Sequence, residues 1–192
     1  DMVLEGGSIT SDGSRFLATT EQCLLNPNRN PALSKAEIEA RLMSELGLSE
    51  VIWLPHGLSL DDDTDGHVDN VAIFIAPGVM VMQGCADRSQ VDHERLKENR
   101  RVAERFDITI REVPVLPTTT YHGEKVQVPY LNFYLVNGGA IVPVCGHPDD
   151  DEMLALLADF MPDREVVGLD IGGILAYGGG GIHCVTQQVP AI

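Results

Sequence analysis

Apolar and polar positions along this chain follow a pattern that recurs about every 60 residues. Each copy begins with two short apolar segments around a turn, which predict a β-hairpin. An amphipathic helix and a further apolar strand follow. In the first copy the predicted strands cover residues 8–10 and 15–25, and the closing strand covers residues 51–55. The pattern therefore predicts a repeated β-β-α-β unit.

The helix of the first copy has clear signals at both ends. Ser34 is followed three residues later by Glu37, the spacing of a capping box. Ile38 and Leu42 fall on one helical face, and Gly47 follows the last apolar position. This predicts a helix that ends at Gly47 and packs through one face.

Two further copies follow. The second has strands over residues 68–75 and 79–85, a helix over 89–106 and a strand over 108–113. The third has strands over 131–136 and 140–145, a helix over 150–161 and a strand over 166–169. Residues 172–192 resemble part of a fourth unit. The connections 55–66 and 114–129 are too long for simple turns, and such loops often carry function.

Units of this kind are typical of radial repetition. Three and a half of them do not close a ring, and the chain starts inside a strand-like segment. We therefore expect an α/β fold of repeated modules in residues 1–192, one catalytic domain from which N-terminal modules are missing. A chain with exposed module sides is expected to self-associate.

Composition narrows the function classes. The chain has 192 residues, of which 44% are hydrophobic and 22% charged, as in globular proteins. Its formal charge of -16 argues against nucleic acid and anionic membranes as partners and suits a cationic small molecule. No apolar run is long enough to span a membrane. The four cysteines lack CxxC spacing, so we expect reduced thiols and a cytoplasmic protein.

A glycine run near the end of the chain presents a candidate nucleophile. Residues 178–188 read Gly-Gly-Gly-Gly-Ile-His-Cys-Val-Thr-Gln-Gln. The glycines, Gly180 and Gly181 among them, allow a tight turn and a close approach to a ligand. Cys184 follows directly, and a thiolate is a strong nucleophile. A flexible loop before a buried cysteine is the alternative. His183 is expected to point away from Cys184 if both lie on a strand.

A second candidate segment opens the second copy. Residues 63–70 read Asp-Thr-Asp-Gly-His-Val-Asp-Asn. On an extended strand His67 and Asp69 would share a face, and carboxylates favour the charged form of a histidine that acts as acid or base. Asp65, His67 and Asp69 could instead ligate a divalent metal ion in a metallohydrolase. A solvated acidic turn is the third alternative.

Glu5 stands at the equivalent point of the first copy, beside two glycines in Leu-Glu-Gly-Gly-Ser. Pseudo-symmetric units place equivalent positions around one axis. Glu5, the pair of His67 and Asp69, and Cys184 on a shared rim would form a site suited to a planar cation.

In these three segments the chain resembles agmatine deiminases, of the guanidine-modifying superfamily that includes bacterial peptidylarginine deiminases. The resemblance covers residues 1–192 and includes the order and spacing of the motifs. It implies a five-bladed α/β propeller around a central site, of which this chain looks like the C-terminal part. It also implies that agmatine is hydrolysed to N-carbamoylputrescine and ammonia.

The resemblance further implies residue roles. Cys184 would attack the guanidinium carbon, and His67 would serve as acid and then base. Glu5 and Asp69 would bind guanidinium N–H groups, with Asp65, Gly180 and Gly181 supporting the site. No metal or organic cofactor is implied. The family commonly has Asn in place of Gly181, and a substrate-binding Asp of the superfamily belongs to the missing modules. Peptidylarginine or free arginine as substrate, and an inactive fragment, stay open.

Overall fold

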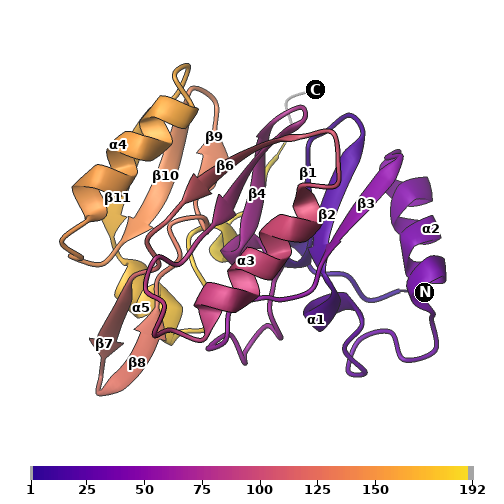
Figure 1. Ribbon diagram of the computed structural model, residues 1–192, viewed down its shortest axis with the longest axis horizontal. Coiled ribbons are helices and arrows are strands. Elements are labelled where there is room, and N and C mark those ends of the chain that lie inside the picture. Colours follow the sequence, from indigo (N-terminus) through magenta and orange to yellow (C-terminus); the bar gives the residue numbers. More distant parts are fainter. Residues whose placement is uncertain (1, 190–192) are drawn as a thin grey trace.

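The computed structural model describes residues 2–189 (Figure 1). Its strands are β1 (Thr10–Ser11), β2 (Phe16–Thr20), β3 (Glu50–Leu54), β4 (Ala72–Ala76), β5 (Val79–Gln83), β6 (Thr109–Val113), β7 (Thr118–Tyr121), β8 (Glu124–Gln127), β9 (Tyr134–Val136), β10 (Gly139–Val144) and β11 (Glu165–Asp170). Its α-helices are α1 (Glu21–Leu24), α2 (Lys35–Leu46), α3 (Asp92–Ala103), α4 (Asp150–Phe160) and α5 (Gly172–Tyr177). Three 3-10 turns complete the set: η1 (Gly6–Ser8), η2 (Val68–Asn70) and η3 (His183–Val185). None of the helices within residues 2–189 is long and apolar enough to cross a membrane.

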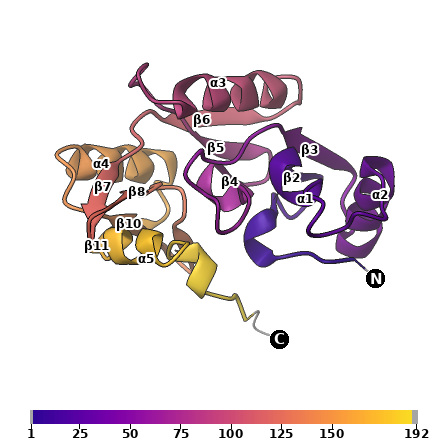
Figure 2. The ribbon, with the colours of Figure 1, turned by 90° about the horizontal axis from the view of Figure 1, so that it is seen from below.

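Three sheets repeat one topology, which confirms the predicted β-β-α-β unit and the mixed α/β class. In each sheet an antiparallel hairpin is followed by a helix and a strand parallel to the second hairpin strand, in the groups β1-β2-β3, β4-β5-β6 and β9-β10-β11. The helix supplies the crossover that a parallel pair needs. Figure 2 shows the three units in an arc, with α2, α3 and α4 on its outer side.

Helices α3 and α4 also pack against the sheet of the preceding unit. The apolar face of α3 meets β3 and joins one core cluster with Ile52 and Leu54 of β3 and Met80 and Met82 of β5. The opposite face of the middle sheet contributes Val81 to a second cluster around α4. Both faces of β4-β5-β6 are therefore buried, as expected for a sheet between two helices.

The outer face of the β9-β10-β11 sheet differs. The face that carries Ala140 and Val142 is buried against α4. On the opposite face Val167 and Leu169 of β11 are each 41% exposed, and Ile141 is paired with Val167 in register. Adjoining Ile174 is 53% exposed. Among the three-stranded sheets of the described residues, this is the face that no helix covers.

The α2 prediction is confirmed in detail. The Ser34 side chain accepts from the Glu37 N–H, the Glu37 carboxylate accepts from the Ser34 N–H, and Gly47 takes φ 69° to end the helix. Apolar Ile38 and Leu42 are buried on one face. The capping box and a left-handed glycine therefore determine both ends.

Two strand predictions are wrong at their ends. Residues 21–24 form α1 because the Thr20 side chain accepts from the Cys23 N–H and caps a helical turn. Residues 68–70 form the 3-10 turn η2, closed by the Val71 N–H to the Val68 carbonyl. Both segments mix polar and apolar residues and are locally helical, which alternation alone does not distinguish from a strand over three or four residues.

The connection 114–129 contains a hairpin that the sequence reading missed. Strands β7 and β8 are joined by His122 and Gly123, whose φ values of 49° and 87° are both positive. This is the backbone of a type I′ turn. The hairpin packs against α5, and the threonine-rich alternation before an X-Gly pair was the available signal.

Candidate active site

Three of the candidate residues line one cavity, and Asp69 contacts Cys184 beside it, whereas Asp65, Gly180 and Gly181 are not among its lining residues. This cavity measures about 600 Å³, and Glu5, His67, His183 and Cys184 are among its lining residues. They come from segments around η1, η2 and η3, so all three sequence motifs meet there. The structure thus brings together the residues that the sequence separated by up to 179 positions (184 − 5).

Gly7 allows the first two motifs to approach each other. A Cβ atom on Gly7 would lie 2.5 Å from His67 Nδ1 and 2.7 Å from Asp69 Oδ2. Any side chain there would displace both groups. The second glycine after Glu5 is therefore explained by close backbone contact rather than by turn geometry.

His67 is held from the backbone side. Its N–H donates to Thr64 Oγ1 at 3.1 Å, and Thr20 Oγ1 donates to the neighbouring Gly66 carbonyl at 2.6 Å. The ring is 8% exposed, and Nε2 has no hydrogen-bond partner among the described residues. Glu5 Oε1 lies 3.5 Å from Nε2, close enough for an ion pair if the ring is protonated. His67 is thus positioned with a free nitrogen.

Glu5 is fixed by a cation that the sequence reading did not identify. Arg29 donates through Nε to both Glu5 oxygens at 3.0 Å and through Nη2 to Oε1 at 2.8 Å. Its Nη1 donates to Asp65 Oδ2 at 2.8 Å. The Arg29 side chain is only 7% exposed. Its hydrogen bonds are the main reason that the pKa of the Glu5 carboxyl lies below its usual value.

Asp65 faces Arg29 and Asn28 rather than the nucleophile. Asn28 Nδ2 donates to Asp65 Oδ2 at 2.7 Å, and this bond, with that of Arg29, lowers the pKa of the Asp65 carboxyl. The residue has φ 56°, a left-handed conformation that Asp tolerates better than most residues. Asp65 therefore supports Glu5 indirectly, through Arg29.

Cys184 lies in η3, not on a strand. Asn132 Nδ2 donates to Cys184 Sγ at 3.2 Å, and the Cys184 N–H donates to Asn132 Oδ1 at 3.3 Å. The thiol also lies 3.4 Å from Asp69 Oδ2, to which it can donate. Desolvation and the Asp69 charge raise the pKa of Cys184 to about 11, while the Asn132 hydrogen bond acts in the opposite direction.

Asp69 is the most buried charged group of the site. It is 1% exposed, and its Oδ2 is also the acceptor position for His183 Nδ1 at 2.9 Å. Its Oδ1 has no hydrogen-bond partner among the described residues. An unpartnered carboxylate oxygen in this setting is costly unless a ligand satisfies it.

Two expectations about side-chain direction are wrong. His67 and Asp69 do not share a strand face, because η2 bends the chain between them. His183 was expected to point away from Cys184, but the 3-10 turn brings both side chains to Asp69. His183, Arg29 and Asn132 were missed because their partners are distant in sequence.

The glycine run packs tightly against Cys184 and Asn132. A Cβ atom on Gly181 would lie 2.3 Å from Asn132 Oδ1, and one on Gly180 would lie 2.9 Å from Cys184 Cβ. Gly181 therefore fits against Asn132, and the Asn common at this position in the resembled family would require that contact to rearrange.

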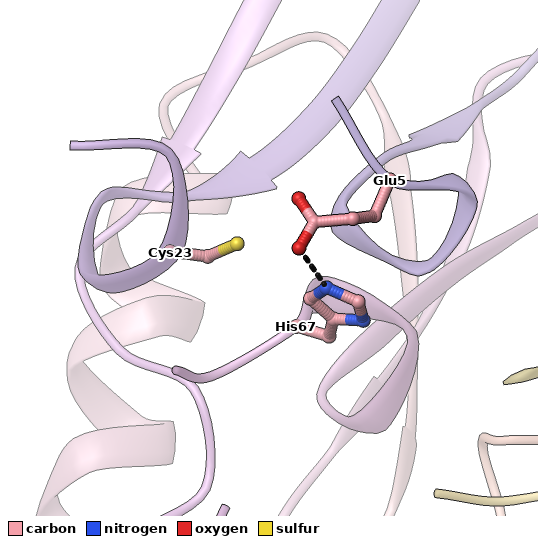
Figure 3. A group of neighbouring side chains, drawn as sticks. All are labelled: Glu5, Cys23 and His67. Atoms are coloured by element: carbon pink, nitrogen blue, oxygen red, sulfur yellow. Dashed lines mark ion pairs between the residues drawn. The ribbon is translucent and has the colours of Figure 1, made fainter. Parts of the chain in front are cut away.

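The metal set considered from sequence is not assembled. Within residues 2–189 the only three-donor group with metal-like spacing is Glu5, Cys23 and His67 (Figure 3). Asp65, His67 and Asp69 do not form such a group. The metallohydrolase alternative thus loses its ligand set.

Comparison with known proteins identifies the family. A family model described as Porphyromonas-type peptidyl-arginine deiminase matches residues 1–190. The chain belongs to this family. It is 41% identical to an agmatine deiminase of Medicago truncatula over 100% of this chain and 58% of that protein. It is 38% identical to an agmatine deiminase of Stutzerimonas stutzeri over 98% of this chain and 57% of that protein.

Solved structures of family members match the fold closely. The agmatine deiminase of Enterococcus faecalis superposes with a TM-score of 0.92 at 33% identity, over 98% of this chain and 57% of that one. A substrate-bound agmatine deiminase of C. jejuni gives 0.91 at 30% identity, over 97% and 56%. An amidinotransferase of Microseira wollei, at 16% identity and a TM-score of 0.58, shares the fold. The chain spans somewhat more than half the length of these agmatine deiminases.

Proposed function

We propose that this chain carries the catalytic centre of an agmatine deiminase, which hydrolyses agmatine to N-carbamoylputrescine and ammonia. The observation that carries the proposal is the unpartnered Asp69 Oδ1 beside Cys184, in the cavity region where His67 Nε2 is also unpartnered. A planar guanidinium offers N–H donors to such a carboxylate. The names of the relatives favour agmatine among guanidine compounds.

Two carboxylates would bind the guanidinium: Asp69, and Glu5, which is paired with Arg29. Asp69 would accept N–H donors through Oδ1, and Glu5 would accept them through the oxygen that Arg29 uses least. Each charge-assisted bond of this kind contributes about 1.5–3 kcal/mol. Arg29 holds Glu5 ionised and in place, so the carboxylate needs no reorganisation when the substrate arrives.

The chemistry would begin at Cys184. In the free site the Cys184 pKa of about 11 disfavours the thiolate; the bound cation favours it, and the thiol proton passes to His67. The thiolate attacks the guanidinium carbon, and the C–N bond to one amino group breaks as His67 protonates the departing ammonia. Water deprotonated by His67 then attacks the thiouronium carbon. The C–S bond breaks, which releases the urea product and restores the thiolate.

The same proposal includes the arrangement of the repeated units as blades of a propeller. In the described three-stranded sheets each face except the outer face of β9-β10-β11 is covered by a helix, and α3 and α4 each cover the preceding sheet. The exposed Val167 and Leu169 occupy the place that a further module's helix would cover. This supports a five-bladed propeller of which residues 1–192 form part of a single catalytic domain.

The partners and the cellular location of the protein are proposed from its composition. A charge of -16 suits a small cationic substrate and argues against nucleic acid or anionic membranes as partners. The described cysteines are free thiols, which fits a cytoplasmic location. No cofactor is required by the reaction as written.

An ammonia assay tests the proposal. The chain is joined to the N-terminal part of the Medicago relative, and agmatine, arginine and an arginyl peptide are offered in turn. We expect ammonia and N-carbamoylputrescine from agmatine, loss of both in Cys184→Ser, and retention in Cys145→Ser, because Cys145 lies outside the cavity lining. Faster release from arginine or the peptide would replace the substrate assignment. Activity that survives Cys184→Ser would overturn the mechanism.

A further inference from the structure

Cys23 is a buried thiol that the proposed reaction does not use. It belongs to α1, is 0% exposed and has no disulfide partner. Figure 3 shows its sulfur directed into the space between the Glu5 carboxylate and the His67 ring. The donor atoms of these three residues all lie within 4.8 Å of one another.

We propose that Glu5, Cys23 and His67 form a binding site for a borderline-soft divalent cation of the Zn²⁺ class, and that the bound cation blocks the active site. Thiolate, imidazole and carboxylate are the ligands that Zn²⁺ takes in proteins. His67 Nε2 is the second observation: its residue is more than nine-tenths buried, and the nitrogen has no hydrogen-bond partner among the described residues.

The donor spacing is close to that of a tetrahedral site. Zn–N, Zn–O and Zn–S bond lengths imply ligand separations of about 3.3–3.6 Å. The separation between His67 Nε2 and Glu5 Oε1 is 3.5 Å. The largest separation in the group is at most 4.8 Å, so the sulfur needs to move by about 1 Å, which a change in its side-chain torsion supplies.

The charge balance favours a dication in spite of Arg29. Glu5, Asp65 and a Cys23 thiolate would contribute three negative charges, and Arg29 contributes one positive charge, which leaves two to neutralise. Burial raises the pKa of Cys23 to about 12, so the metal must take the place of the thiol proton. Arg29 makes one hydrogen bond to Glu5 Oε2 and two to Oε1. Because the Arg29 Nε–H is shared between both oxygens, its bond can pass wholly to Oε2, which leaves a lone pair for the metal on Oε1, the oxygen 3.5 Å from His67 Nε2.

The location makes such a cation an inhibitor. Glu5 and His67 both line the cavity that contains Cys184, so a cation can enter from the cavity and keep water as its fourth ligand. The same two side chains would bind guanidinium and transfer protons under the proposed function, on which this inhibitory consequence rests. Metal binding and substrate binding would be mutually exclusive.

Cobalt titration of the chain itself tests binding, because all three ligands lie within it. Co²⁺ should give a thiolate-to-metal charge-transfer absorption that Zn²⁺ displaces. Cys23→Ser should abolish the absorption and weaken Zn²⁺ at least tenfold in competition with a chromophoric chelator, while Cys184→Ser should retain both. Circular dichroism shows whether Cys23→Ser is folded. His67→Gln removes a second ligand and should also lose the absorption, which separates loss of a ligand from misfolding of Cys23→Ser.

Opposite results would overturn the site. An absorption lost in Cys184→Ser but kept in Cys23→Ser would place the metal on the nucleophile, and no absorption in the unchanged chain would exclude the site. Inhibition is measured as the Zn²⁺ concentration that halves ammonia release in the joined protein, which should rise at least tenfold in Cys23→Ser. Metal binding without any ammonia release would leave the site in place and refute only the proposed function.

Discussion

At the scale of single residues, the reactivity of Cys184 depends on two neighbours that act in opposite directions. The Asp69 carboxylate disfavours the thiolate, whereas the amide of Asn132 donates a hydrogen bond to the sulfur. Asn132 is 0% exposed and also donates to Asn70 Oδ1 at 2.7 Å, so it cannot turn away without losing a buried bond. The sulfur therefore has a fixed electrostatic environment before any substrate binds.

Isosteric substitutions of these two residues should shift the Cys184 pKa in opposite directions. Asp69→Asn removes a negative charge beside the thiol and should lower its pKa from about 11, whereas Asn132→Asp adds one and should raise it. A nearby charge changes a pKa by about 1–3 units. The measurement is the rate of iodoacetamide labelling against pH, with Cys184 identified by peptide mapping.

Asn99→Asp is the matched control for that experiment. Asn99 is equally buried but bonds the backbone of His56, away from the cavity. It should leave the labelling profile unchanged. Shifts in the same direction in Asp69→Asn and Asn132→Asp would contradict the electrostatic argument.

Gly181→Ala should disturb the nucleophile by overpacking. Its Cβ would lie 2.3 Å from Asn132 Oδ1, so either the loop or Asn132 must move. We expect a loss of about 1–3 kcal/mol in unfolding free energy and slower labelling of Cys184. Urea denaturation and the labelling assay measure the two effects. Gly173→Ala, whose Cβ would have only ordinary contacts at 3.5 Å or more, is the control.

At the scale of elements, the helices differ in whether a side chain caps their first turn. The capping box of α2 is complete, and Ser34 and Glu37 satisfy each other's N–H groups. By contrast, α3 and α4 have no side-chain cap hydrogen bond, so packing between two sheets must account for more of their stability.

Ser34→Ala should therefore destabilise the fold through α2. Loss of an N-cap costs about 1 kcal/mol. Ser44→Ala, at an exposed position inside the same helix, should be neutral or slightly stabilising. Urea midpoints of the two variants make the comparison. Equal midpoints would show that α2 does not unfold with the rest of the chain.

At the scale of the whole molecule, the fold is a series of sheets and helices that cover each other in turn. Helices α3 and α4 each bury apolar side chains of two sheets, and the series leaves the outer face of β9-β10-β11 exposed, with Val167 and Leu169 each 41% exposed. An apolar surface of this kind favours association when no neighbouring module covers it.

The chain alone should consequently self-associate. It should also release little ammonia from agmatine, because the family resemblance places one substrate-binding Asp in N-terminal modules. Leu169→Lys should shift sedimentation toward the monomer, because it charges the uncovered face. Leu46→Lys changes an equally exposed leucine (43%) at the end of α2 and should not. A chain that is monomeric at every concentration and fully active by itself would show that this face needs no partner.

The sequence determined the repeat and the capped helix α2, and it supplied the candidates for the chemically active residues. Alternation, a capping box and glycine turns are local signals, and the three motifs are short enough to be read without a fold. These features gave Glu5, His67, Asp69 and Cys184 as candidates, and the structure gathers them around one cavity.

Only the tertiary structure decided how those residues face one another. Arg29 reaches Glu5, and Asn132 reaches Cys184, across 24 and 52 positions, distances over which sequence spacing carries no geometric information. The directions of His67, Asp69 and His183 depend on the 3-10 turns η2 and η3, which are too short for sequence periodicity to distinguish from strands. The position of Cys23 beside Glu5 and His67 likewise follows from the packing of α1 under the first sheet, because buried contacts between distant segments are fixed by packing and not by local propensity.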